Sequence, residues 1–173
     1  IAIGHQAMSA LVKYDGSTYA NGNIAIGKGA MTGGQPSSGS FEYNIAIGES
    51  ALNSTGTSAA ITGTIAIGAS ALTALTTGSQ NTAIGYQAMA AADGSEGGNV
   101  AIGYQAMTSV NAGSNGDGNV AIGSQVLTGG TSTGNNNVAI GNVTMSGSSN
   151  AADNCVVIGA GAGSGDMTAG ADG

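Results

Sequence analysis

The stretch NVAIGYQAM, residues 99–107, decides the fold, because close variants of it recur along almost the whole chain. Each of nine copies contains an Ile-Gly step, and the glycines of these steps are Gly4, Gly27, Gly48, Gly68, Gly85, Gly103, Gly123, Gly141 and Gly159. Spacers of 8 to 14 residues, rich in Gly, Ser, Thr and Asn, separate the copies. A recurring pattern of this kind indicates one small structural unit that stacks on its neighbours.

The first four residues of the motif alternate as a β-strand does. Val100 and Ile102 share one face, and Asn99 and Ala101 share the other. The fourth position is Ile in every copy, and these Ile-Gly pairs carry the structural repeat: Ile26, Gly27, Ile47, Gly48, Ile102, Gly103, Ile122 and Gly123. Both faces are apolar, as in a strand buried on both sides. We expect the Ile/Val face to fill the interior of its own coil and the alanine face to be covered by a second chain.

The remaining motif positions predict a tight turn and a small core. A glycine at every copy indicates positive φ or an approach too close for a Cβ atom, and we expect it to join two short strands. The residue after it varies from copy to copy and should face solvent, whereas the later Ala and Met/Leu should be buried. Two interpretations of the opening Asn stay open: a hydrogen-bonded ladder from coil to coil, or a residue suited to the turn.

These columns predict an all-β fold, a parallel β-solenoid or β-roll of nine coils. At about 4.8 Å per coil the rod would be roughly 40 Å long. We expect one repeat domain over residues 1–163 and a Gly-rich tail or linker over 164–173, and we expect the chain to be a segment of a longer protein. A coil this thin has little core of its own, so association of several chains would supply further burial.

Composition argues against several classes of function. The net charge is −7 and Lys13 and Lys28 are the only basic residues apart from His5, so a nucleic-acid partner is not expected. No apolar run reaches the roughly 20 residues of a membrane span. With one histidine and scattered acids, we expect no enzyme, no cofactor and no metal site. Cys155 stands alone and reads as a small apolar filler.

The aromatic residues are the candidate contact groups. They are Tyr14, Tyr19, Phe41, Tyr43, Tyr86 and Tyr104. The last two occupy the varied position of adjacent copies. Exposed aromatic rings commonly stack on sugars or contact proteins. The alternative is that they pack onto the surface of the roll.

NVAIGYQAM, NTAIGYQAM and NIAIGESAL resemble the Ala-Ile-Gly repeats of YadA-like trimeric autotransporter adhesin heads, and more closely the AIGYQA repeats of bacteriophage tail fibres. The resemblance implies a homotrimer of left-handed parallel β-rolls in a virion or on a cell surface. It would act as a fibre shaft or receptor-binding head whose partner is a host-cell glycan or protein. Repeat spacings of 17 to 23 residues favour the phage fibre over the bacterial adhesin head. A third alternative, an ice-binding solenoid, needs aligned threonine columns, and the threonines do not read as aligned in the sequence.

Overall fold

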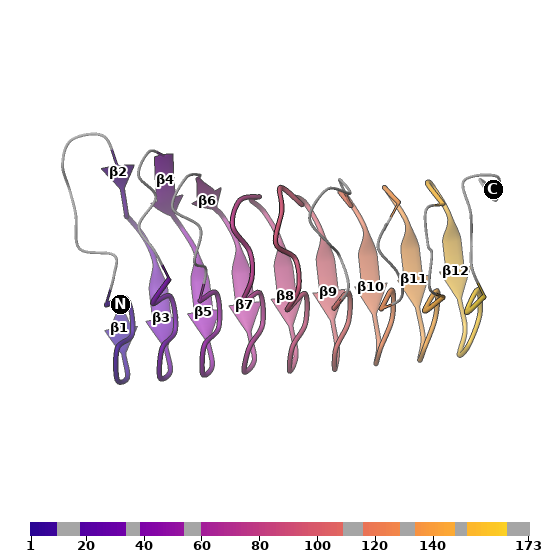
Figure 1. Cartoon of the computed structure of the whole chain (residues 1–173), viewed down its shortest axis with the longest axis horizontal. Coiled ribbons are helices and arrows are strands. Elements are labelled where there is room, and N and C mark those ends of the chain that lie inside the picture. The colour runs from indigo at the N-terminus through magenta and orange to yellow at the C-terminus, as the bar shows by residue number, and fades with distance from the viewer. Residues whose placement is uncertain are drawn as a thin grey trace.

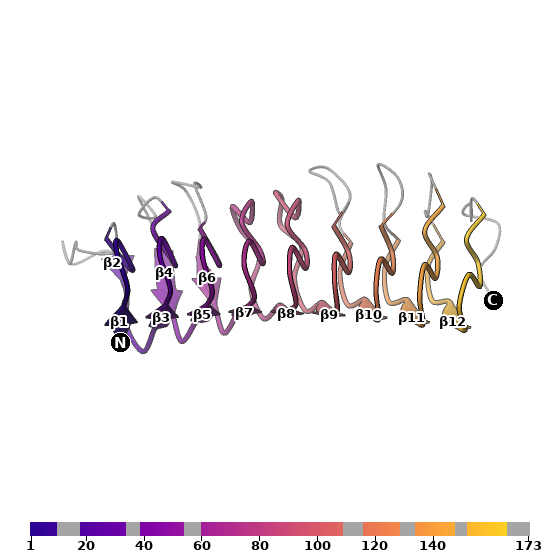
Figure 2. The same cartoon turned by 90° about the horizontal axis from the view of Figure 1, so that it is seen from below.

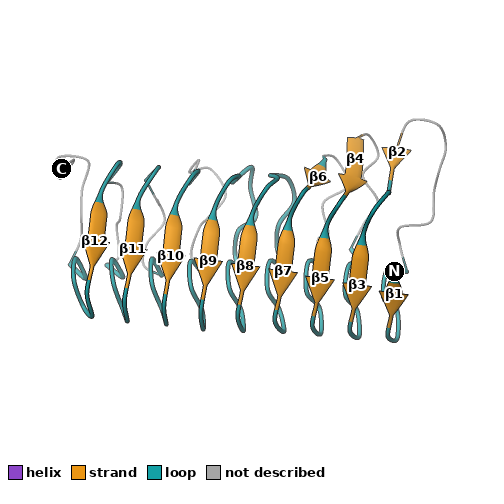
Figure 3. Ribbon diagram, turned by 180° about the vertical axis from the view of Figure 1, so that it is seen from behind, coloured by secondary structure: helices purple, strands orange, loops and turns teal. Residues whose placement is uncertain are grey.

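The computed structural model describes residues 1–9, 18–33, 39–53, 60–108, 116–128, 134–147 and 152–165. Within these ranges the chain is all-β and forms a parallel β-solenoid, an elongated row of similar coils (Figure 1). Figure 3 shows only strands and loops in the described part of the chain. The fold class predicted from the repeat is therefore confirmed.

Each copy of the motif supplies one strand to a nine-stranded parallel sheet. The strands, in their order across the sheet, are β1 (Ala2–Ile3), β3 (Ile24–Ile26), β5 (Ile45–Ile47), β7 (Ile65–Ile67), β8 (Thr82–Ile84), β9 (Val100–Ile102), β10 (Val120–Ile122), β11 (Val138–Ile140) and β12 (Val156–Ile158). The register matches motif position to motif position, as in the pairing of Ala101 with Ala121. Spacers of unequal length therefore leave the sheet undisturbed.

A second, smaller parallel sheet accompanies the first coils. It consists of β2 (Thr18–Tyr19), β4 (Gly39–Glu42) and β6 (Ile61–Thr62). Figure 1 places it at the N-terminal end of the row, above the starts of the neighbouring strands of the large sheet. Two inward residues of this sheet, Phe41 and Ile61, are buried and widen the core there.

The turn after each strand combines a glycine with two left-handed residues. Gly103 has a φ of 134°, and a Cβ atom placed on it would lie 2.1 Å from the carbonyl oxygen of Gly123 in the next coil. Both reasons for a glycine, the backbone angle and the close contact, therefore hold. Gln105 and Met107 follow with φ of 51° and 53°, values that non-glycine residues seldom adopt.

Main-chain hydrogen bonds compensate for this unusual conformation. Gln105 N–H donates to the carbonyl of Tyr86 in the preceding coil at 2.9 Å, and Met107 N–H donates to that of Val126 in the following coil at 2.8 Å. The second side of each coil is thus bonded to both neighbours, although its residues form turns. The expected second short strand after the glycine is wrong, because alternating φ signs cannot make a pleated strand.

The interior is lined by alanine from the sheet and by Ala and Met/Leu from the turn. Ala101, Ala106 and Met107 have no exposed surface. Figure 2 shows the row of coils from below, with the strands of the large sheet along one side and the turns and loops rising from them. Such an interior has room for a methyl group on the strand side once methionine or leucine enters from the turn side.

The predicted assignment of the two strand faces is therefore wrong. The alanine face lines the interior, and the Ile/Val face points outward, where Val100 and Ile102 are half-buried. The reason is steric, since the large β-branched side chains do not fit inside so thin a coil. Within the described part of the chain, the Ile/Val face is the one that other residues do not fully cover.

Candidate functional site

The opening asparagines form an internal clamp. The Asn99 side chain donates from Nδ2 to the carbonyl of Gly116 at 2.7 Å, and its Oδ1 accepts from Asn119 N–H at 2.8 Å. The same pair of bonds to the next coil recurs for these buried residues: Asn23, Asn44, Asn81, Asn99, Asn119 and Asn137. The ladder interpretation is confirmed, with bonds that run from side chain to main chain. The residue before the Asn takes the left-handed turn, as Gly98 does with a φ of 69°.

A second ladder of polar side chains, not predicted from the sequence, lies two residues before the first. Asp117 Oδ1 accepts from Gly97 N–H at 2.8 Å, and Asn135 Oδ1 accepts from Asp117 N–H at 3.0 Å. These side chains reach toward the preceding coil, whereas the asparagine clamp reaches toward the following one. Asp117 is thus engaged in structure, and so is Asp153, which accepts from Asn135 N–H.

Two buried polar groups depart from this order. Thr64 replaces the clamp asparagine in one coil, and its Oγ1 has no hydrogen-bond partner among the described residues. Glu96 is also buried. Its Oε2 accepts from Gly94 N–H at 3.0 Å, and its Oε1 is unpaired within the described part of the chain. Burial is the main cause that raises the pKa of Glu96; backbone hydrogen bonds lower it, and Asp93 and Asp117 raise it further.

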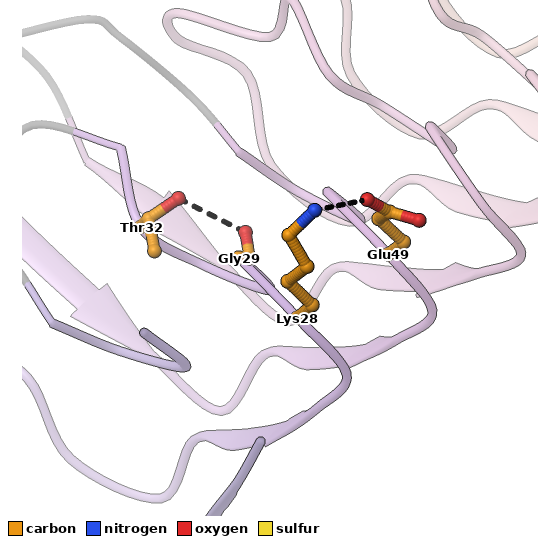
Figure 4. A network of polar contacts seen from close by, with 4 residues as sticks. All are labelled: Lys28, Gly29, Thr32 and Glu49. Atoms are coloured by element: carbon orange, nitrogen blue, oxygen red, sulfur yellow. Dashed lines mark hydrogen bonds and ion pairs between the residues drawn. The ribbon is translucent and has the colours of Figure 1, made fainter. Parts of the chain in front are cut away.

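The varied position after each glycine forms an exposed column along the turns. Lys28 Nζ and Glu49 Oε1 lie 3.0 Å apart on adjacent coils of this column (Figure 4), with their side chains 68% and 60% exposed. An ion pair so exposed contributes little to stability. His5, also in this column, is exposed, as its position in the motif predicted.

Tyr86 and Tyr104 come together in the same column. Their ring centroids are 5.7 Å apart and the ring planes differ by 10°, so the rings stack. Each tyrosine is 50% exposed. A glutamine ladder runs beside them, with Gln105 Nε2 donating to Gln87 Oε1 at 2.9 Å and Gln125 Nε2 donating to Gln105 Oε1 at 3.3 Å. In the sequence, this arrangement is indicated by a Tyr-Gln dipeptide that occupies the same positions in two adjacent copies of the motif.

The other aromatic candidates do not join this pair. Phe41 is buried in the core at 4% exposure, so its prediction as a contact residue is wrong, because its strand turns it into the wide N-terminal coils. Tyr43 is 67% exposed but precedes β5, at the strand end opposite to the Tyr86 column, and its ring lies over Gly22. Tyr14 lies outside the described residues, as does the side chain of Tyr19.

The outer face of the nine-stranded sheet is strongly apolar. Two columns of side chains, the second and fourth motif positions, run along it, and Thr82 is their only member that is neither Ile nor Val. Most members are half-buried, and Ile122 is 36% exposed. No charged residue occupies either column. Aliphatic surface that is continuous over this many strands is uncommon on a monomer.

Threonine occupies the position after Met/Leu in four of the nine motif copies, with other residue types in the rest, so it forms no continuous column. These residues are Thr32, Thr73, Thr108 and Thr128. Their hydroxyl groups are used internally: each donates to the carbonyl three residues back, as Thr32 Oγ1 does to Gly29 at 2.9 Å (Figure 4). Donors used in this way do not form the regular exposed hydroxyl array that an ice-binding face needs.

Within the described part of the chain, no three His, Cys, Asp or Glu side chains gather closely enough to hold a metal ion. The described residues also contain no helix long and apolar enough to cross a membrane. Cys155 is buried in the column of the clamp asparagines, consistent with a filler. No protein-family profile, no curated protein and no solved structure matches the chain.

Proposed function

We propose that this chain is a structural and adhesive fibre segment that assembles as a homotrimer through the outer face of its nine-stranded sheet. The observation that carries the proposal is the pair of aliphatic columns along that face. They lie on a backbone that main-chain hydrogen bonds and the asparagine clamp join from coil to coil, so the face is ordered as well as apolar.

Association along this face would follow from burial and geometry. The Ile and Val side chains are half-buried in one chain, and a second copy would cover the surface that remains exposed. Each Å² of apolar surface removed from water in this way stabilises the assembly by about 25 cal/mol. The columns run along the rod, so copies would lie side by side around an axis parallel to it. The number three comes from the resemblance to Ala-Ile-Gly fibre repeats.

In this proposal the segment is the shaft or receptor-presenting part of a phage tail fibre, and the same architecture would serve a bacterial surface adhesin head. It therefore belongs in a virion or at a cell surface, with a host-cell glycan or protein as its partner. A catalytic role is not proposed. The rod supports this function because it extends by simple repetition and can carry contact residues at a fixed spacing.

The decisive experiment measures mass in solution. We expect light scattering on the purified chain to give three times the mass of one chain. Ile102→Glu places a charge on the outer face and should give monomers that keep their β-sheet circular dichroism, because Ile102 points away from the interior. A monomeric parent chain, or an Ile102→Glu variant that stays trimeric, would overturn the proposed interface.

A further inference from the structure

The column after the glycines brings four residues into register on successive coils. Main-chain bonds of the turn fix this order: Gln87 N–H donates to the carbonyl of Ala69, and Gln105 N–H donates to that of Tyr86, at 3.0 and 2.9 Å. Ser124 follows Tyr104 in the same way. The column therefore reads Ala69, Tyr86, Tyr104, Ser124, with one side chain per coil.

The tyrosine stack leaves two ring faces uncovered within this column. The near-parallel rings of Tyr86 and Tyr104 cover one face of each other. The outer face of Tyr86 looks along the column toward Ala69, whose side chain is a single methyl group. Between Tyr86 and the next long side chain, Glu49, the column therefore carries only the methyl group of Ala69, and we call this stretch of the column the slot.

Glu49 stands one coil beyond Ala69 in the same column and brings a hydrogen-bond acceptor to that end of the slot. Its Oε1 pairs with Lys28, while the carboxylate as a whole is exposed and has further lone pairs to offer. The slot thus combines an aromatic face, a small floor and a carboxylate. That combination suits a ring with one apolar face and hydroxyl groups at its edge.

We propose that this slot binds an uncharged pyranose ring of a glycan. The apolar face of the sugar would stack on Tyr86, and hydroxyl groups at its edge would donate to Glu49. This inference rests on the proposed function, since it names the class of receptor that the fibre would contact. The ring of Tyr104 would act as a support that holds Tyr86 in a fixed orientation.

Two other ring-bearing ligands fit the charges less well. A nucleic-acid base can stack on tyrosine, but its phosphates would meet a chain with a net charge of −7. A free anion would meet Glu49, and Lys28 is already paired with that carboxylate. A neutral sugar avoids both problems.

The test fills the slot without changing the fold. Ala69→Tyr would extend the stack by one ring and cover the outer face of Tyr86, and this column already accepts tyrosine at two coils. Ala160→Tyr makes the same substitution at the end of the column and serves as the control. Ser124→Tyr covers only the outer face of Tyr104. The probe is cellohexaose, a neutral oligosaccharide whose β-linked glucose rings have apolar faces, and binding is followed by the chemical shifts of the tyrosine ring protons.

We expect Ala69→Tyr and Tyr86→Ala each to weaken cellohexaose binding at least about tenfold. Glu49→Gln should weaken it less, and Ala160→Tyr and Ser124→Tyr should bind like the parent. No binding by the parent chain, equal binding by Ala69→Tyr, or loss confined to Ser124→Tyr would overturn the proposal. Light scattering on the same samples reports trimer formation independently, so failure of the sugar site and failure of the fibre assembly are distinguishable.

Discussion

Removal of one clamp asparagine, Asn99→Ala, tests how the coils are held together. The substitution deletes the bond from Nδ2 to the Gly116 carbonyl and the bond from Asn119 N–H to Oδ1. The N–H of residue 99 itself still donates to Asn81 Oδ1 at 3.0 Å. The damage is therefore confined to the junction with the following coil.

The magnitude follows from the burial of the two abandoned groups. Gly116 and Asn119 are buried, so water does not replace the lost partners. An unsatisfied buried donor or acceptor costs about 1–3 kcal/mol, which gives about 2–6 kcal/mol for the pair. Asn99→Asp keeps the acceptor for Asn119, but it turns an oxygen toward the Gly116 carbonyl and buries a charge, so we expect it to cost at least as much as Asn99→Ala at neutral pH.

Urea unfolding followed by circular dichroism measures the loss, and amide hydrogen exchange locates it. We expect the Asn119 amide to lose protection in Asn99→Ala, while amides on the N-terminal side of the substituted coil change less, because repeat arrays couple mainly to their neighbours. Gln105→Ala is the control, since it removes side-chain bonds on the surface and should cost within about 0.5 kcal/mol. If Asn99→Ala matched this control and the Asn119 amide stayed protected, the clamp would not be what joins the coils.

Two further predictions concern the buried polar groups that depart from the ladder. Thr64→Asn restores the column residue, so we expect it to supply an acceptor to Asn81 N–H and to stabilise the rod by about 1 kcal/mol in urea unfolding; unchanged or lower stability would contradict this. Glu96→Gln concerns a carboxyl whose pKa is raised by burial, which means that the folded state binds the proton more tightly than the unfolded state. Stability of the parent chain is then highest below the unfolded pKa and falls as pH rises through the folded pKa. We therefore expect Glu96→Gln to melt above the parent at pH 7 and to match it below about pH 4, near the ordinary carboxyl pKa; a gap that widens toward low pH would refute the assignment.

The repeat predicts the architecture because its period and its alternation act together. A strand of three or four residues at equal positions in every copy leaves parallel in-register pairing as the simple solution, and Ala101 opposite Ala121 shows it. The invariant glycine was predictable for the same reason. Its two constraints, positive φ and contact with the next glycine, are both properties of a backbone that repeats.

The choice of inner face was not predictable from residue size and hydrophobicity. Hydrophobicity favours Ile102 inside and Ala101 outside, whereas the structure has the reverse. The deciding quantity is the distance between the two sides of the coil, which depends on the left-handed residues Gln105 and Met107. Neither residue type favours that conformation, so local propensity gave no warning of a turn this tight. Tertiary hydrogen bonds between coils impose it.

Once the turn is known, the motif separates into constrained columns and one free column. Asn99 is committed to the clamp, Ala101 to the interior, Gly103 to the contact with Gly123, and Met107 to the core. Even the glutamine column must adopt positive φ. Among the motif positions, the residue directly after the glycine has a negative φ and is exposed in most coils. Its identity varies along the chain, from His and Lys to Glu, Ala, Tyr, Ser and Asn. A solenoid built in this way can vary its surface chemistry coil by coil at little structural cost, which is why we expect contact residues in this column.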